Sequence, residues 1–179
     1  MNQKFMKDYY RMTGHAWKGS LKNYLSLAAH HNLRYVYFLR QYERRPSVLL
    51  RLLLHRMTLK FGLEISPKAN IAEGFYLGHP YNITIAAGVQ IGRNVNVHKG
   101  STIGRESRGK RVGVPTIGNH VWIGINAVIV GNVTIGDDVL IAPGSFVNRD
   151  IPSHSVVVGN PCTIHKRDDA TYGYVNFTN

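Results

Sequence analysis

Histidines are the residues of this chain whose type and spacing could do chemistry, and His79 stands out because a proline follows it directly. An imidazole has an ordinary pKa of about 6.5, so at pH 7 much of it is neutral and can take a proton from a hydroxyl group. His98 and His120 follow at steps of nineteen and twenty-two residues. Three neutral imidazoles and a water can also hold a catalytic zinc ion, although these spacings alone do not bring the three residues to one site.

The composition indicates a folded chain, and the net charge indicates an anionic partner. The 179 residues are 44% hydrophobic and 18% charged, which fits one domain with an appendage. No run of eighteen uncharged apolar residues occurs, so we expect no membrane span. The net charge of +12 favours nucleic acid, acidic glycans, lipid headgroups or a polyanionic small molecule. We do not expect nucleic acid, because no recognition helix or aromatic stacking platform is evident.

The single cysteine and the N-terminus favour a cytoplasmic location. Cys162 has no second cysteine with which to form an internal disulfide. The first fifteen residues contain no apolar core followed by a small-residue cleavage site.

The part of the chain before about residue 60 has helical spacing. Apolar residues recur three and four positions apart from Leu21 onward, and a second apolar segment follows Pro46. Proline is favoured at the first position of a helix, so we expect that helix to start there and to end at Gly62.

After residue 60 the aliphatic residues recur every six positions, which is the period of neither a helix nor an ordinary strand. They form three runs: Ile65, Ile71 and Leu77; Ile85, Ile91, Val97 and Ile103; and Ile117, Ile123, Ile129, Ile135, Ile141 and Val147. This pattern predicts a coil of flat faces joined by tight turns, in which each aliphatic side chain stacks on the one a full coil away.

Two interruptions of the six-residue period mark candidate functional loops. The step from Leu77 to Ile85 is eight residues, so two residues are added beside His79. The step from Ile103 to Ile117 is fourteen, which we interpret as two coil faces plus two residues. It contains residues 105–111, Arg-Glu-Ser-Arg-Gly-Lys-Arg, here called the basic excursion. Solenoid proteins often carry function in such insertions.

The six-residue pattern, the basic excursion and the closing runs at 150–155 and 159–162 resemble the left-handed β-helix acetyltransferases, over roughly residues 60–167. Within that superfamily the chain is most similar to the serine acetyltransferase and capsule polysaccharide O-acetyltransferase branch. The resemblance implies a mainly β fold, a left-handed parallel β-helix of hexapeptide repeats with an N-terminal α-helical segment. We place the segments at 1–61 for the helices, 62–167 for the β-helix and 168–179 for a C-terminal tail.

The same resemblance implies that His79 is the general base of an acetyl-CoA-dependent O-acetyltransferase. In the serine acetyltransferase branch an aspartate fifteen residues before the catalytic histidine orients it, and here Glu64 has that place. A backbone N–H in the glycine-rich coils would stabilise the oxyanion.

Two departures from the branch point away from serine as the acceptor. Serine acetyltransferases carry an aspartate just before the catalytic histidine, where this chain has Gly78. They also carry Arg-His-Pro where this chain reads Gly113-Val114-Pro115. A site without these groups suits a zwitterion poorly, so we expect a sugar hydroxyl in a polysaccharide pathway, with serine as the alternative.

CoA would be the polyanionic small molecule, bound along the coils without a metal. The resemblance places the residues of the groove wall and the cations for the phosphates as follows: Ser101, Gly104, Ala127, Gly144 and Ser145 for the wall; Lys110, Arg111, Lys166 and Arg167 for the phosphates.

Two other functions stay open. Solenoids of this shape include metal-dependent carbonic anhydrases, and His79, His98 and His120 are three candidate ligands. His98 and His120 fit solvent-facing turn positions better. A non-catalytic scaffold is the other alternative, although it would have no reason to combine a His-Pro insertion with the basic excursion.

The resemblance also implies homotrimers with active sites between neighbouring subunits. Trp122 points away from the core and is a candidate oligomer contact. Residues 1–64 carry twelve Lys and Arg against three acidic residues. Their apolar residues could pack on the coil or on a second trimer, or the basic face could rest on the inner face of an anionic membrane.

Overall fold

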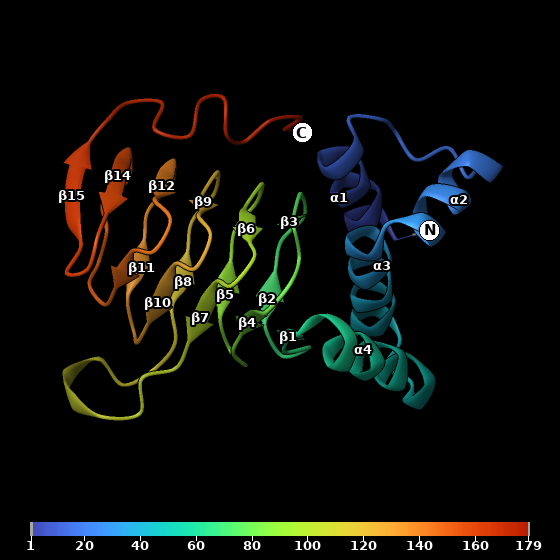
Figure 1. Ribbon diagram of the computed structural model, residues 1–179, viewed down its shortest axis with the longest axis horizontal. Helices are drawn as coiled ribbons and strands as arrows, with labels where there is room; N and C mark the ends of the chain where they lie inside the picture. The colour runs from blue at the N-terminus through green and yellow to red at the C-terminus, as the bar shows by residue number, and fades with distance from the viewer. Residues whose placement is uncertain (1, 179) are drawn as a thin grey trace.

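The computed structural model describes residues 2–178 and confirms a β-solenoid of hexapeptide repeats preceded by helices (Figure 1). The outermost positions of the ranges 1–61 and 168–179 lie outside the described residues. The helices are α1 (Gln3–Thr13), α2 (Leu21–Ala29), α3 (His31–Arg44) and α4 (Val48–Phe61), with a 3-10 turn at Gly109–Arg111. None of the helices in this part of the chain is long and apolar enough to cross a membrane.

Three sheets, parallel except for the last strand, form the faces of the solenoid, and the chain visits them in turn. The five-stranded sheet contains β1 (Leu63–Ile65), β4 (Ile83–Ile85), β7 (Thr102–Gly104), β10 (Val128–Val130) and β13 (Phe146–Val147). The four-stranded sheet contains β2 (Asn70–Ile71), β5 (Gln90–Ile91), β8 (Thr116–Ile117) and β11 (Thr134–Ile135). The six-stranded sheet contains β3 (Tyr76–Gly78), β6 (Asn96–His98), β9 (Trp122–Ile123), β12 (Val139–Ile141), β14 (Ser155–Val158) and β15 (Thr163–Lys166).

The predicted stacking of aliphatic residues is confirmed by the strand register. In the five-stranded sheet Ile65 pairs with Ile85, Ile85 with Ile103, Ile103 with Ile129 and Ile129 with Val147. All five side chains are buried, so each coil shields the core of the next.

One part of the period was interpreted wrongly. Ile117 pairs with Ile91 in the four-stranded sheet, so the chain passes from Ile103 directly to the next face. The fourteen-residue step is therefore one face plus an eight-residue loop, rather than two faces plus two residues. Glu106 and Gly113 form an antiparallel bridge across the base of this loop, which lets it leave and rejoin the coil without disturbing the stack.

The helices cover the first coil, whose core would otherwise be open to water. Phe5 of α1 and Leu39 of α3 are fully buried together with Leu77 of β3. Helix α4 begins after the N-cap Ser47, so Pro46 lies just before the helix rather than at its first position. Gly62 ends α4 in a left-handed conformation, as predicted. At the other end, β15 pairs antiparallel with β14 and closes the solenoid.

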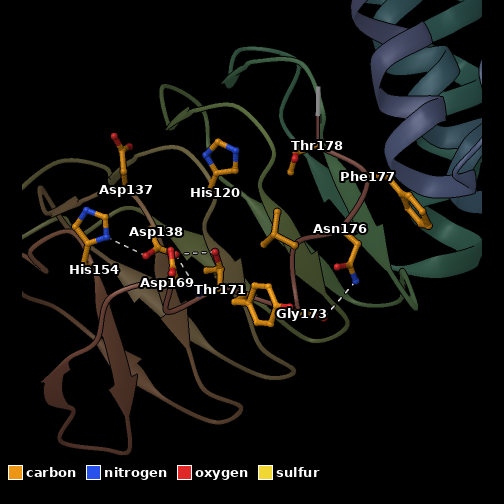
Figure 2. A pocket seen from close by; sticks show the side chains of 12 residues that line it. His120, Asp137, Asp138, His154, Asp169, Thr171, Gly173, Asn176, Phe177 and Thr178 are labelled. Carbon is orange, nitrogen blue, oxygen red and sulfur yellow. Dashed lines mark hydrogen bonds and ion pairs between the residues drawn. The ribbon is translucent and has the colours of Figure 1, made fainter.

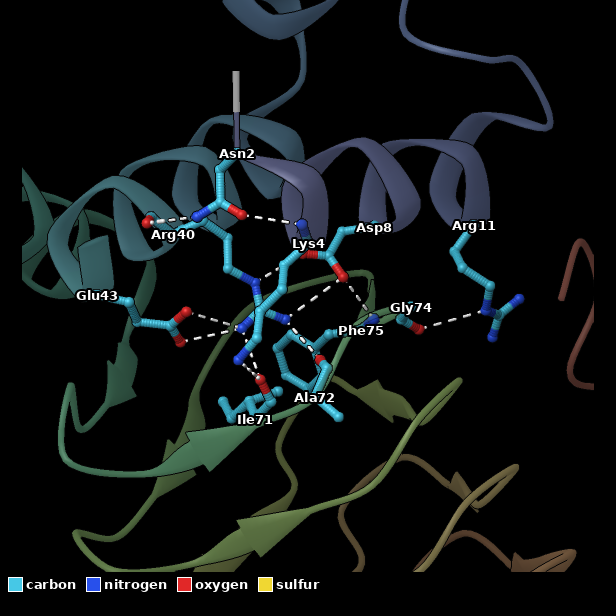
Figure 3. A network of polar contacts seen from close by, with 10 residues as sticks. All are labelled: Asn2, Lys4, Asp8, Arg11, Arg40, Glu43, Ile71, Ala72, Gly74 and Phe75. Carbon is cyan, nitrogen blue, oxygen red and sulfur yellow. Dashed lines mark hydrogen bonds and ion pairs between the residues drawn. The ribbon is translucent and has the colours of Figure 1, made fainter. Parts of the chain in front are cut away.

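A buried ion pair fixes the helices to the first coil (Figure 3). The Asp8 carboxylate of α1 accepts from Arg40 Nε of α3 at 2.8 Å, and both side chains are fully buried. The same carboxylate accepts from the Phe75 backbone N–H at 2.8 Å. Arg40 also donates to the Ile71 and Ala72 carbonyls at 2.7 and 2.6 Å. Two helices and the turn between β2 and β3 thus share one network.

The tail covers the six-stranded sheet, an arrangement that the sequence did not indicate. The Asp138 carboxylate accepts from the Thr171 hydroxyl at 2.7 Å and from the Thr171 and Ala170 N–H groups at 3.0 Å. Further along, the Tyr174 ring lies 5.1 Å from that of Trp122. Trp122, a candidate oligomer contact, is thus covered by the chain's own tail.

Removing Asp8 should strongly destabilise the protein. Asp8→Ala leaves the buried Arg40 with Glu43 as its one remaining carboxylate partner and leaves the Phe75 N–H without its acceptor, so we expect a loss of about 3 kcal/mol in the free energy of unfolding, measured by denaturant titration. Lys7→Ala on the same helix is the matched control, because Lys7 pairs with Glu73 at 3.3 Å near the surface. That variant should lose less than about 1 kcal/mol. Equal losses in the two variants would contradict a structural role for the network.

Candidate active site

His79 stands at a corner of the solenoid, in the turn that joins β3 to β4. It is exposed and adopts a left-handed backbone conformation with φ of 48°. The two added residues lie in this turn, since Gly78 ends β3 and Ile83 begins β4. The predicted association of His79 with the first insertion is therefore confirmed. Because the turn lies outside the stacked positions, it presents the imidazole to solvent without cost to the core.

The helical segment packs against this turn. The Asn82 N–H donates to the Phe61 carbonyl at the end of α4 at 2.9 Å. The Tyr81 ring lies 5.1 Å from the imidazole of His31 and 5.8 Å from the Phe61 ring. Burial lowers the pKa of His31, so it packs as a neutral aromatic ring at pH 7. The helices therefore hold the His79 turn in place as well as covering the first coil.

His98 is the neighbour of His79 that sequence reasoning placed wrongly. It was expected in a solvent-facing turn, but it ends strand β6 and its Nε2 atom is buried without a hydrogen-bond partner among residues 2–178. Burial, with a smaller contribution from the nearby His79, lowers the pKa of His98 to about 4. His98 is therefore neutral at pH 7 and adds no positive charge beside His79. Nothing in the sequence distinguished His98 from a residue in a turn.

Gly78 and His98 fit together so closely that any side chain at position 78 would force the His98 ring to move. The two pair in register between β3 and β6. A Cβ atom added to Gly78 would lie 2.3 Å from His98 Nδ1, well inside van der Waals contact. The other face of the His98 ring packs on Trp122, with the ring centroids 4.8 Å apart. The imidazole thus occupies the space that a side chain at position 78 would need.

Glu64 is not joined to His79 in the single chain. It stands exposed in β1, and among residues 2–178 no hydrogen bond or ion pair connects the two side chains. Its role as the orienting carboxylate stays a proposal.

The three histidines considered as metal ligands do not meet. His120 precedes β9, whereas His79 follows β3, and these parallel strands place the two residues at opposite edges of the six-stranded sheet. His120 instead shares a hydrogen bond with Asn94 at 3.2 Å. No cluster of three metal-ligating side chains occurs within the described part of the chain. The carbonic anhydrase alternative has no support from this geometry.

Most of the residues expected in a CoA groove wall face inward. Ser101, Ala127 and Ser145 occupy equivalent buried positions in three successive coils. The Ser101 hydroxyl donates to the Gly124 carbonyl at 2.9 Å, and the Ser145 hydroxyl accepts from the Gly159 N–H at 3.1 Å. These three residues are fully buried in the single chain, backbone included, so they do not line an open groove there. Gly104 is also buried, while Gly144 lies exposed at a corner.

The four cations expected at the CoA phosphates lie at two different corners. Lys110 is exposed in the basic excursion, and Arg111 beside it forms an ion pair with Asp150 at 3.2 Å. Lys166 and Arg167 follow β15, where the Arg167 N–H donates to the His154 carbonyl. Neither pair lies at the corner of His79. The assignment of these four cations to the CoA phosphates stays a prediction.

One hollow lies away from His79, between the tail and the corner that carries His120 and His154 (Figure 2). Its volume is about 830 Å³. Two of its three acidic residues hold the structure together: Asp138 binds the tail and His154, and Asp137 accepts from the Asn119 N–H. Burial raises the pKa of Asp138, but the hydrogen bonds from Thr171, His154 and Ala170 outweigh it and lower the pKa overall. The hollow is thus a consequence of tail packing.

Comparison with known proteins supports the solenoid fold and indicates which hexapeptide-repeat family the chain resembles. Residues 115–149 match the family described as bacterial transferase hexapeptide (six repeats). The structure is similar to serine acetyltransferase from Neisseria gonorrhoeae in complex with serine, with a TM-score of 0.70 and 29% identity over 91% of this chain and 66% of that one. It is also similar to serine acetyltransferase from Brucella abortus in complex with coenzyme A, with a TM-score of 0.67 and 26% identity over 76% and 56%.

Curated relatives carry the same name. Serine acetyltransferase from Synechococcus elongatus is 36% identical over 67% of this chain and 49% of its own length. The chain spans only 34–61% of the length of the first four relatives, which have additional sequence. The match to serine acetyltransferase from Helicobacter pylori strain 26695, at 32% identity, spans 71% of this chain and 74% of that protein. Together with the shared solenoid, this shows that the chain belongs to the serine acetyltransferase family of hexapeptide-repeat proteins.

Proposed function

We propose that this protein is an acetyl-CoA-dependent O-acetyltransferase and that its first acceptor to test is serine. The observation that carries the proposal is family membership, since relatives named serine acetyltransferase align with up to 74% of their length. These relatives support serine, the alternative in the sequence analysis, better than the sugar hydroxyl that it expected. They lend no support to polysaccharide biosynthesis.

His79 is the proposed general base. The acceptor oxygen would attack the thioester carbonyl carbon while its proton moves to the imidazole, and the C–S bond would then break to release CoA. An alcohol attacks slowly unless it loses that proton, and base catalysis of this kind is worth about 100- to 10,000-fold. The neutral His98 beside it supports the assignment, because a second positive charge would hinder protonation of His79. Glu64 is proposed to orient His79 once the bound state brings them together.

A homotrimer is proposed to complete the site. In one chain the basic excursion and the β15 cations lie at corners other than that of His79, so these cations would reach CoA phosphates bound near His79 from a neighbouring subunit. Lys110 is the best candidate, because it is exposed while Arg111 beside it is paired with Asp150. A cytoplasmic location also stays a prediction.

A sugar hydroxyl is retained as the second candidate acceptor because of one observation. The imidazole of His98 fills the space that a carboxylate directly before His79 would need in order to pair with an ammonium group. A neutral imidazole there can hydrogen-bond an uncharged hydroxyl instead. The serine proposal and the sugar proposal therefore predict different acceptor preferences at the same site.

Replacing His79 should abolish acetyl transfer without unfolding the protein. His79→Asn keeps a residue that tolerates the left-handed conformation, and we expect thiol release from acetyl-CoA to fall by about 100-fold or more. His120→Asn is the matched control, since His120 has φ of 53° at another corner. Serine, simple sugars and capsule-type oligosaccharides should be assayed in parallel. Undiminished turnover in His79→Asn would rule out His79 as the base. Equal losses of activity in both variants would mean that the loss does not depend on His79 in particular.

The contact between Gly78 and His98 can be tested by a double-mutant cycle. Gly78→Asp alone should destabilise the fold by about 1–3 kcal/mol, because its Cβ overlaps the His98 ring. His98→Ala should recover most of that loss when the two changes are combined, as measured by denaturant unfolding. If serine is the natural acceptor, the double variant should also show a lower KM for serine. Additive losses in stability would contradict the packing described here.

A further inference from the structure

Helix α4 leaves an unusual amount of apolar surface in water. Val48, Leu49, Leu52 and Leu59 are 76%, 67%, 58% and 75% exposed, while the helix buries only Leu54 and Met57 completely. With 3.6 residues per turn, Val48, Leu52 and Leu59 fall on one narrow stripe opposite the buried pair, and the exposed His55 lies within the same stripe. Figure 1 shows α4 at the helical end of the molecule, beside β1 and away from the rest of the solenoid. Nothing in residues 2–178 covers this stripe.

Cations flank the stripe on both sides. At helical spacing Arg51 lies along one edge, and Arg56 and Lys60 lie along the other. All three are exposed, and so are Arg44 and Arg45 just before the helix. The sequence from residue 44 to residue 63 contains no acidic residue. The preceding acid is already engaged in the core network, so this surface has no counter-charge of its own.

We infer that α4 is a lipid-surface helix, which binds flat on an anionic bilayer. An apolar stripe flanked by Arg and Lys is the pattern of interfacial helices, whose apolar side chains enter about 5–10 Å below the headgroups while their cations remain at the phosphates. A bilayer accepts protruding leucines such as Leu52 without a preformed groove. The inference does not depend on the proposed acetyl transfer.

Charge argues against a symmetric pairing of α4 with α4 as the occupant. Pairing α4 with α4 would set Arg51, Arg56 and Lys60 of one subunit against the same residues of the other. Like charges brought together around a dry apolar seam are destabilising, whereas anionic lipid supplies the missing negative charge.

The test is flotation of the full chain with vesicles of phosphatidylcholine alone or mixed with phosphatidylglycerol. The native protein should bind only the mixed vesicles, and less strongly at high salt. Leu52→Gln with Leu59→Gln should weaken binding by about tenfold or more, because both side chains are exposed and only the lipid contact is lost. Arg51→Gln with Arg56→Gln should weaken it by roughly an order of magnitude.

Two matched pairs of exposed residues elsewhere serve as controls. Val112→Gln with Val158→Gln removes apolar surface from the solenoid, and Lys68→Gln with Arg149→Gln removes the same charge. Both pairs should bind lipid like the native protein. The inference is overturned if the mixed vesicles fail to bind the native chain, or if the α4 pairs bind as well as the controls. It is also overturned if the leucine pair lowers the oligomer mass without lipid, because the stripe would then be a contact between copies.

Discussion

The stacking of one aliphatic side chain on the next, coil after coil, is the constraint on which the rest of the structure depends. Each hexapeptide is too short to be stable alone, and only the buried columns beginning at Ile65, Ile71 and Leu77 hold the coils together. A stack of this kind has two open ends. The helices cover one of them through the Asp8–Arg40 network, and the β14–β15 pair covers the other.

The same constraint explains where this protein can carry chemistry. Inward positions cannot change without disturbing two neighbouring coils, so variation is confined to corners and outward faces. The His79 turn and the basic excursion both leave the stack between consecutive aliphatic positions and rejoin it in register. The Gly78–His98 contact shows the limit of that freedom, because an outward residue in one coil restricts its counterpart in the next.

The six-residue period predicted the solenoid, its core residues and the place of His79 beside an interruption of the stack, because each depends only on spacing along the chain. It could not predict contacts between outward side chains of adjacent coils, and so it missed the burial of His98 against Gly78. The covering of Trp122 by Tyr174 was missed for a similar reason, since the tail has no periodicity that would place it on a sheet. The inward orientation of Ser101 was also missed, because small residues at the corners fit either an internal or a groove position.

The central claim is that the reaction takes place at the His79 corner rather than in the hollow beneath the tail. The most direct measurement is a titration of the imidazole ¹⁵N signals with acetyl-CoA, with assignments from single histidine variants. The signals of His79 and His98 should shift as the ligand binds, while those of His120 and His154 should stay in place. Shifts at His120 and His154 with His79 unmoved would place the ligand under the tail and contradict the account.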